Sequence, residues 1–165
     1  MRITIVGVGN ILLQDEGVGV HALERLRERF EFPENVSLID GGTMGLDLLP
    51  FIEDTDRLLL IDAIDFKKEP GTIGIIEDDG IPAVIKTKIS PHQIGLSDLF
   101  SVMRLLDRKP LSISVIGIQP ERLETTTELS ETVKQSLNSL INAIIEKLTQ
   151  WGVKVKAKDV SCCSL

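Results

Sequence analysis

The sequence predicts a three-layer α/β sandwich formed by a single domain. Segments with the apolar, β-branched composition of buried strands alternate along the chain with segments whose apolar residues recur at helical spacing. A length of 165 residues is enough for one domain with a substantial core. We expect this domain to span residues 1–152 and residues 153–165 to form a C-terminal tail.

The N-terminal segment is the one around which we expect a functional site to form. Residues 3–8 have the composition of a strand that is buried on both faces. Gly9 ends this strand, where the backbone must turn or approach another group closely. Asp15 and Glu16 follow, and we expect Asp15 to cap the first helix. In α/β proteins such an acidic pair faces the crevice that usually holds the site.

The remaining strands are predicted from apolar runs that end in turn residues. They span residues 36–39, 58–64, 72–77 and 111–118. The run at 58–64 is the most apolar of the chain and predicts a central strand. The run at 72–77 follows a Pro-Gly turn, and we expect it to form an antiparallel edge strand.

Helices are expected between these strands. Helical spacing of apolar residues predicts one helix after Asp15, a short one at 46–52 despite its internal proline, and a long C-terminal one capped by Ser130. The sequence Ser90-Pro91-His92-Gln93 has the form of a capping box and predicts the start of another helix. Gly152 is expected to end the last helix.

Composition and charge argue against several classes of function. A net charge of −7 argues against nucleic acid or an anionic membrane as the main partner. No apolar run approaches the roughly 20 residues that span a bilayer, and because Met1-Arg2 runs straight into a predicted strand, we expect no signal peptide. Cys162 and Cys163 are adjacent and cannot staple the fold. We therefore expect a cytoplasmic protein, and its small size and acidic surface are compatible with the monomer that we expect when it is free.

Common catalytic motifs are absent from the sequence. It contains no Gly-x-Ser-x-Gly elbow, no His-Glu-x-x-His, no Walker loop and no zinc-binding cysteine pair. Gly7 and Gly9 after the first strand, with Asp40 at the end of the second, imitate a dinucleotide-binding fingerprint. Leu12 stands where the third glycine of that fingerprint belongs, so the nucleotide signal is weak.

Four polar residues lie at the ends of predicted strands or the start of a predicted helix. They are Glu16, Asp40, Asp62 and His92. Because parallel strands place their carboxyl ends at one edge of the sheet, these side chains are expected at a common rim. Two carboxylates and one imidazole, with coordination positions left open, form a site suited to a divalent transition metal.

Each of these residues also has a structural interpretation. Glu16 is favourable in a first helical turn through the helix dipole, and Asp40 could accept hydrogen bonds from loop amides. Asp62 is harder to explain in this way, because a charge inside an apolar strand needs a partner or a task. His92 could be an ordinary loop histidine, although a helix N-terminus favours the neutral ring that binds metals.

In combination, six motifs of the sequence resemble the hydrogenase maturation endopeptidases. The motifs are Gly7-Val8-Gly9-Asn10-Ile11-Leu12, Asp15-Glu16-Gly17-Val18-Gly19, Asp40-Gly41-Gly42-Thr43, Asp62-Ala63, Ser90-Pro91-His92 and Gly117-Ile118-Gln119-Pro120. They occur in the family's order, and the resemblance runs from residue 3 to about residue 150. It implies an α/β/α sandwich around a twisted, mostly parallel five-stranded sheet.

The resemblance also implies an activity. The family removes a C-terminal peptide from the precursor of the nickel–iron hydrogenase large subunit after nickel insertion. Its metal ligands correspond to Glu16, Asp62 and His92, and they are thought to recognise nickel that the substrate carries. Asp40 is a further candidate for positioning substrate or water. The alternative is a non-catalytic nucleotide- or metal-binding module, such as a nickel chaperone.

Overall fold

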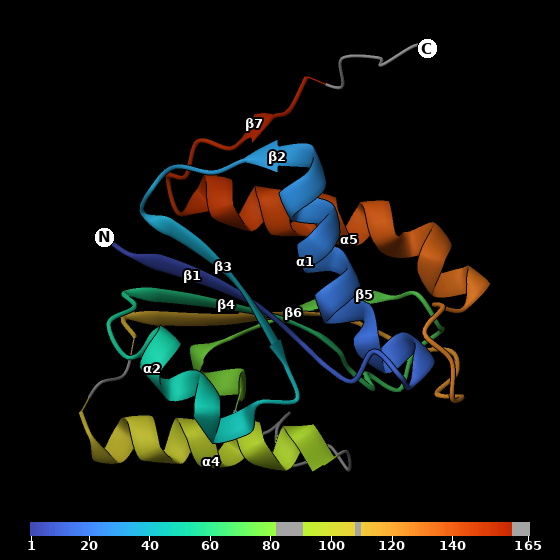
Figure 1. Ribbon diagram of the computed structural model, residues 1–165, viewed down its shortest axis with the longest axis horizontal. Coiled ribbons are helices and arrows are strands. Elements are labelled where there is room, and N and C mark those ends of the chain that lie inside the picture. The colour runs from blue at the N-terminus through green and yellow to red at the C-terminus, as the bar shows by residue number, and fades with distance from the viewer. Residues whose placement is uncertain (82–90, 108–109, 160–165) are drawn as a thin grey trace.

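A single mixed sheet lies between two layers of helices (Figure 1). The computed structural model describes residues 1–81, 91–107 and 110–159, with the backbone alone for 91–97. The sheet contains five strands in the order β3-β1-β4-β6-β5. Their bounds are β1 (Ile3–Val8), β3 (Val36–Gly42), β4 (Arg57–Ala63), β5 (Ile73–Glu77) and β6 (Ser112–Ile118).

The pairing of the strands confirms the predicted mostly parallel sheet. β1 pairs in parallel with β3 and with β4, and β4 pairs in parallel with β6. β5 is an edge strand that runs antiparallel to β6, as its Pro-Gly turn indicated. Every residue of β1 is buried, and β4 is buried from Leu58 to Ala63, which explains their continuous apolar composition.

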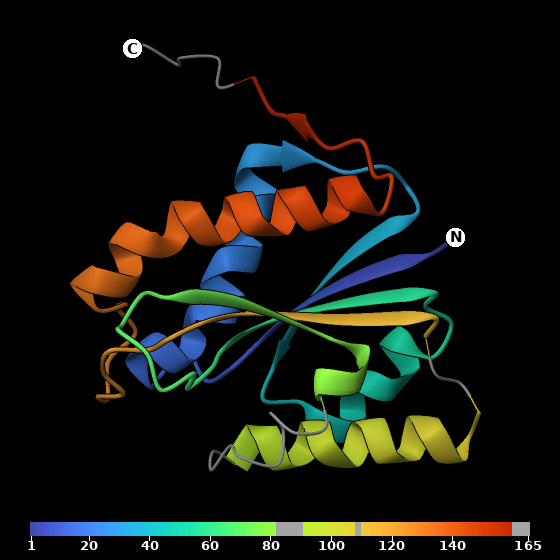
Figure 2. The same ribbon diagram turned by 180° about the vertical axis from the view of Figure 1, so that it is seen from behind.

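Two helices cover one face of the sheet, and the other face is covered by shorter elements and one long helix (Figures 1 and 2). The first layer consists of α1 (Val18–Arg29) and α5 (Glu131–Gln150). The second consists of α2 (Leu49–Ile52), α4 (Pro91–Leu105) and the 3-10 helix η2 (Gly45–Leu48). Two other 3-10 helices are η1 (Gln14–Gly17) and η3 (Asp78–Gly80). The α/β/α sandwich predicted from the sequence is therefore confirmed.

Each helical layer encloses its own apolar core against the sheet. On the α1 and α5 face, α5 contributes a stripe that is buried along the length of the helix. The stripe consists of Val133, Leu137, Leu140, Ile141, Ile144 and Leu148. On the other face, Leu99 and Met103 of α4 pack with Leu58 and Leu60 of β4. The predicted cap of α5 is also present, because the Ser130 hydroxyl accepts a hydrogen bond from the Val133 amide.

Local predictions differ from the structure in three places. Asp15 does not cap α1, because the cap position belongs to Gly17 and no side chain caps the helix. The second strand continues beyond residue 39 to Gly42. The predicted helix at 46–52 is one turn of 3-10 helix followed by one α-helical turn, and Pro50 stands in the first turn of α2, where its missing N–H breaks no helical bond.

The chain beyond α5 returns to the body of the molecule. The short strand β7 (Lys156–Ala157) pairs antiparallel with β2 (Phe30–Glu31), and Val153 is buried. The domain boundary at residue 152 stays a prediction. Among the residues that the structure describes, no helix combines the length and the apolar character that crossing a membrane requires.

Candidate functional site

Two glycines allow the segment that carries Glu16 to lie directly against the carboxyl edge of the sheet. Gly9 has φ +126°, and a Cβ on it would overlap the carbonyl of Glu16. Gly19 lies against the carbonyls of Ile61 and Val8, and a Cβ there would overlap both. The backbone of η1 and α1 can therefore approach the ends of β1 and β4 only because these positions lack side chains. The contact places Glu16 at this edge, where it is 4% exposed.

Asp62 lies at the same edge, near the end of β4, and is 1% exposed. Because Leu58 and Leu60 pack toward the layer that contains α4, strand alternation places Asp62 on that face as well. Figures 1 and 2 both place the start of α4 on the side of the molecule where the parallel strands end. His92 is the second residue of α4, and its side chain lies outside the described residues.

Asp40 is at the same edge but in a different environment. It is exposed, and its carboxylate accepts a hydrogen bond of 3.0 Å from the amide of Gly42, which has φ +39°. In the register of the sheet, Asp40 on β3 is level with Gly7 on β1 and with Ile61 on β4. Because β1 lies between β3 and β4, the backbones of Asp40 and Ile61 are roughly 10 Å apart. Alternation along β3 turns it toward the α1 face, away from the face of Asp62. Its visible role is to hold the turn after β3.

Asp15 has a structural role that the sequence did not reveal. It is fully buried, and its carboxylate accepts hydrogen bonds from three backbone amides, those of Glu121, Arg122 and Ser130, at 2.8 to 3.0 Å. The Ser130 hydroxyl donates a fourth bond of 2.7 Å. These bonds tie η1 to the segment between β6 and α5. Asp15 thus holds its neighbour in the chain, Glu16, in place. Its position next to Glu16 is the only sequence signal of this role.

Gln119 organises the segment that follows Asp62. Its side-chain carbonyl accepts a hydrogen bond of 2.7 Å from the Phe66 amide, and its side-chain amide donates to Asp65. Its own backbone pairs with Gly71 and Thr72. Sequence reasoning had singled out the Gly-Ile-Gln-Pro motif only through a family resemblance. The structure explains the glutamine in it as the connector between the ends of β6 and β4.

Asp65 is held ionised by this network. The Lys67 ammonium lies 2.8 Å from the Asp65 carboxylate, the Lys67 amide donates a bond of 3.0 Å, and Gln119 adds a third. Together they lower the pKa of Asp65 from 3.8 to about 2, with the hydrogen bond from the Lys67 side chain as the largest cause. The same contact raises the pKa of Lys67.

Glu16 and Asp62 fit a divalent cation by the chemistry of their donor atoms. Burying a carboxylate costs several kcal/mol unless it is hydrogen-bonded, paired or bound to a metal. Two carboxylates form an incomplete set on their own, since transition-metal sites commonly add an imidazole. Among the side chains that the structure describes, no group of three histidine, cysteine or acidic residues could hold a metal. A third ligand would therefore have to come from the undescribed residues, which include the side chain of His92, or from another molecule.

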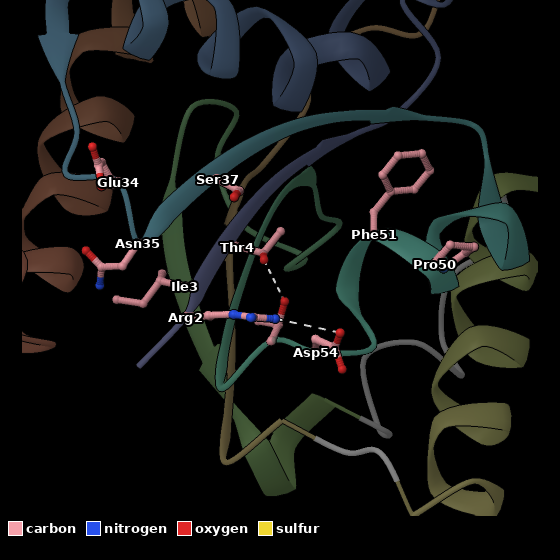
Figure 3. Close-up of a pocket in the computed structure, with 10 residues that line it drawn as sticks. Arg2, Ile3, Thr4, Glu34, Asn35, Ser37, Pro50, Phe51 and Asp54 are labelled. Atoms are coloured by element: carbon pink, nitrogen blue, oxygen red, sulfur yellow. Dashed lines mark hydrogen bonds and ion pairs between the residues drawn. The ribbon is translucent and has the colours of Figure 1, made fainter.

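A hollow elsewhere on the surface is separate from these carboxylates. It has a volume of about 560 Å³ and lies at the amino ends of β1 and β3, beside α2 (Figure 3). Thr4 and Thr55 share a hydroxyl hydrogen bond of 2.6 Å within it, and Arg2 forms an ion pair of 3.7 Å with Asp54. This is the edge of the sheet opposite to Glu16 and Asp62, so the hollow does not belong to the candidate site.

Comparison with known proteins gives consistent results. The family model described as hydrogenase maturation protease matches residues 20–147. The chain is 41% identical over 160 residues to the hydrogenase 2 maturation protease of Escherichia coli K12, covering 96% of this chain and 98% of that protein. It is 40% identical to the hydrogenase expression/formation protein HupD of Bradyrhizobium diazoefficiens, covering 96% of this chain and 83% of that protein.

Solved structures show the same similarity. The hydrogenase maturating endopeptidase HybD of Escherichia coli superimposes with a TM-score of 0.93 at 39% identity, over 98% of this chain and 100% of that one. The nickel–iron hydrogenase maturation protease HybD of Thermococcus kodakarensis gives a TM-score of 0.74 at 32% identity, over 90% of this chain and 99% of that one.

The contacts of Asp15 predict that Asp15→Ala destabilises the protein by about 3 kcal/mol, because three backbone amides, one of them buried and two part-buried, lose their acceptor. The free energy of unfolding in urea measures this loss. Asp47→Ala, at an exposed acidic residue of η2, is the matched control and should change stability by no more than about 0.5 kcal/mol. Equal effects of the two substitutions would refute the anchoring role of Asp15.

The close approach of backbones predicts that Gly19→Ala destabilises the protein by about 2 kcal/mol or more, because the new methyl group overlaps backbone carbonyls that cannot move independently. Thermal unfolding measures this. Gly80→Ala is the control, since among the described residues its Cβ would meet the Cγ2 methyl of Ile76, at 3.0 Å, and no backbone atom. A Gly19→Ala variant as stable as Gly80→Ala would show that the contact is not required.

The lowered pKa of Asp65 predicts a pH dependence of stability. Ionised Asp65 stabilises the folded state above pH 3.8, and this contribution is lost as the pH falls from 3.8 toward 2. The Asp65→Asn variant should therefore lose less stability than wild type across this interval, as measured by urea unfolding at a series of pH values. Parallel pH profiles of the two proteins would contradict the assignment.

Proposed function

The chain belongs to the hydrogenase maturation protease family, and from this membership we propose how its buried carboxylates act on the substrate. The protein is an endopeptidase that cleaves a hydrogenase large-subunit precursor. This activity replaces the alternative of a non-catalytic nucleotide- or metal-binding module. The finer proposal is that it removes a C-terminal peptide from the precursor after nickel has been inserted.

In this proposal Glu16, Asp62 and His92 are ligands for nickel that the substrate carries. The observation that carries it is the near-complete burial of two carboxylates, Glu16 and Asp62, at one edge of the sheet. Their oxygen atoms and an imidazole nitrogen are donors that suit a transition metal with open coordination positions. The position of His92 at the start of α4, toward which Asp62 faces, supports the third ligand.

Nickel bound to the precursor would serve as a recognition element and as a source of Lewis acidity. A metal ion near the scissile bond can polarise its carbonyl or lower the pKa of an attacking water. The protein's own residues hold the metal-bearing segment at the carboxyl edge, and the buried setting strengthens their electrostatic interaction with the cation. This mechanism accounts for a sequence without a conventional nucleophile motif.

Asp40 would contribute indirectly to the same reaction. Its carboxylate holds the turn at Gly42, and this turn borders the segment after β1 through a hydrogen bond of 2.8 Å from the Gly9 amide to the Gly42 carbonyl. We therefore propose that Asp40 shapes the turn at Gly42, which borders the substrate, and that it does not bind the metal directly. The free enzyme is proposed to be a cytoplasmic monomer.

A processing assay tests the ligand assignment. Glu16→Gln, Asp62→Asn and His92→Ala should each lower the rate of cleavage of a nickel-loaded large-subunit precursor by about 100-fold or more, because each removes a ligand to the metal. Mass spectrometry measures loss of the C-terminal peptide. Wild type should cleave only the nickel-loaded form.

Asp47→Asn is the control variant, because it neutralises an exposed carboxylate outside the buried pair. It should cleave at the wild-type rate. Nickel-independent cleavage by wild type would refute recognition of the metal. Full activity of a folded Glu16→Gln or Asp62→Asn variant would remove that residue from the ligand set.

A further inference from the structure

We propose that a cluster of exposed apolar side chains beside the buried carboxylates is the docking surface for apolar residues of the precursor next to the scissile bond. The cluster consists of Ile11, Leu12, Met44, Leu46 and Leu123, and we call it the rim patch. The inference rests on the proposed function, since it concerns the same substrate. It assigns a binding role to residues that contribute nothing to metal ligation.

The first two loops of the rim patch leave neighbouring strands at the carboxyl edge of the sheet. Residues 10–13 follow β1, and residues 43–46, which include the start of η2, follow β3. The strands remain paired up to their ends, and the Gly9 amide donates a further hydrogen bond of 2.8 Å to the Gly42 carbonyl. The apolar side chains of these two loops therefore extend from adjoining backbone segments.

The third loop joins the first through backbone contacts. Leu123 lies between β6 and α5, in a segment whose Arg122 carbonyl accepts a hydrogen bond of 3.3 Å from the Asp15 amide. Leu13 and Thr126 form a bridge of the kind found between strands. Figures 1 and 2 both show this segment beside the one that follows β1. The buried carboxylate of Asp15 holds the arrangement in place.

The rim patch is unusual because its exposed apolar side chains lie close together. Its five side chains are 37–57% exposed. Single exposed apolar residues are normal on a protein surface, but a group of them on adjoining loops marks an interaction site. Two other exposed apolar side chains lie apart from it: Leu105 ends α4, and Leu111 precedes β6 at the opposite edge of the sheet.

The position of the rim patch identifies its occupant. Ile11 and Leu12 are separated by Leu13 alone from η1, which carries Glu16, so the patch is continuous with the site where the scissile bond must lie. An endopeptidase has to hold its substrate on either side of that bond. Exposed aliphatic side chains bind aliphatic or aromatic side chains by removing both from water. The occupant is therefore an apolar stretch of the precursor chain.

Steady-state cleavage of the nickel-loaded precursor, with its concentration varied, tests the proposal. The double variant Leu12→Ser with Leu123→Ser should raise KM by about tenfold or more, because two apolar contacts with substrate are lost. Its kcat should stay within about twofold of wild type, since the metal ligands are intact. The double variant Leu105→Ser with Leu111→Ser is the matched control and should leave KM unchanged.

The outcomes separate this proposal from the function on which it rests. An unchanged KM in the rim-patch variant, or an equal rise in the control, would overturn the docking surface while the endopeptidase remains. Failure of folded wild type to cleave would overturn the proposed mechanism, and the docking surface with it. Sedimentation provides a further check. If the wild type sediments as a dimer and the rim-patch variant as a monomer, the patch would be a contact between two copies of the chain, and the docking surface would be overturned.

Discussion

The close contact between the start of α1 and the ends of β1 and β4 is the constraint on which the rest of the structure depends. Gly19 lies against two strand carbonyls, and Gly9 lies against the carbonyl of Glu16, with no room for a side chain at either position. This contact closes one end of the core on the α1 face. It also places a carboxylate at the sheet edge without a long loop that would leave its position undetermined. Packing of the fold and geometry of the site therefore have one physical origin.

Adjacent acidic residues in η1 have different roles. Asp15 satisfies backbone amides of the segment between β6 and α5 and is fully buried. Glu16 lies at the same edge as Asp62. A carboxylate that accepts several amide hydrogen bonds stabilises a loop by satisfying several backbone donors at once. The hydrogen bonds of Asp15 fix the backbone of η1, and a fixed backbone keeps the side chain of Glu16 in place for metal binding.

The candidate site combines a buried pair of acidic side chains with an apolar border. Glu16 and Asp62 are withdrawn from water, while the rim patch presents aliphatic side chains on the loops around them. The two parts suit different features of one substrate: the carboxylates suit a cation, and the border suits the polypeptide that carries it. Affinity for the precursor would then come largely from the border, and the choice of the nickel-loaded form from the carboxylates.

Local patterns in the sequence determined the alternating elements, the central position of β4, the antiparallel edge at β5 and the cap of α5 at Ser130. They did so because burial on both faces, a Pro-Gly turn and a capping hydroxyl each act within a few residues. The sequence also determined which carboxylates belong to strand ends, and so predicted Glu16 and Asp62 at one edge.

Only the tertiary structure decided the role of Asp15, the face of the sheet on which Asp40 lies, and the joining of three apolar loops into the rim patch. Those properties depend on contacts between segments about one hundred residues apart or on neighbouring strands, as the bonds from Asp15 to Ser130 show. No local pattern encodes which distant amide a buried carboxylate will bind.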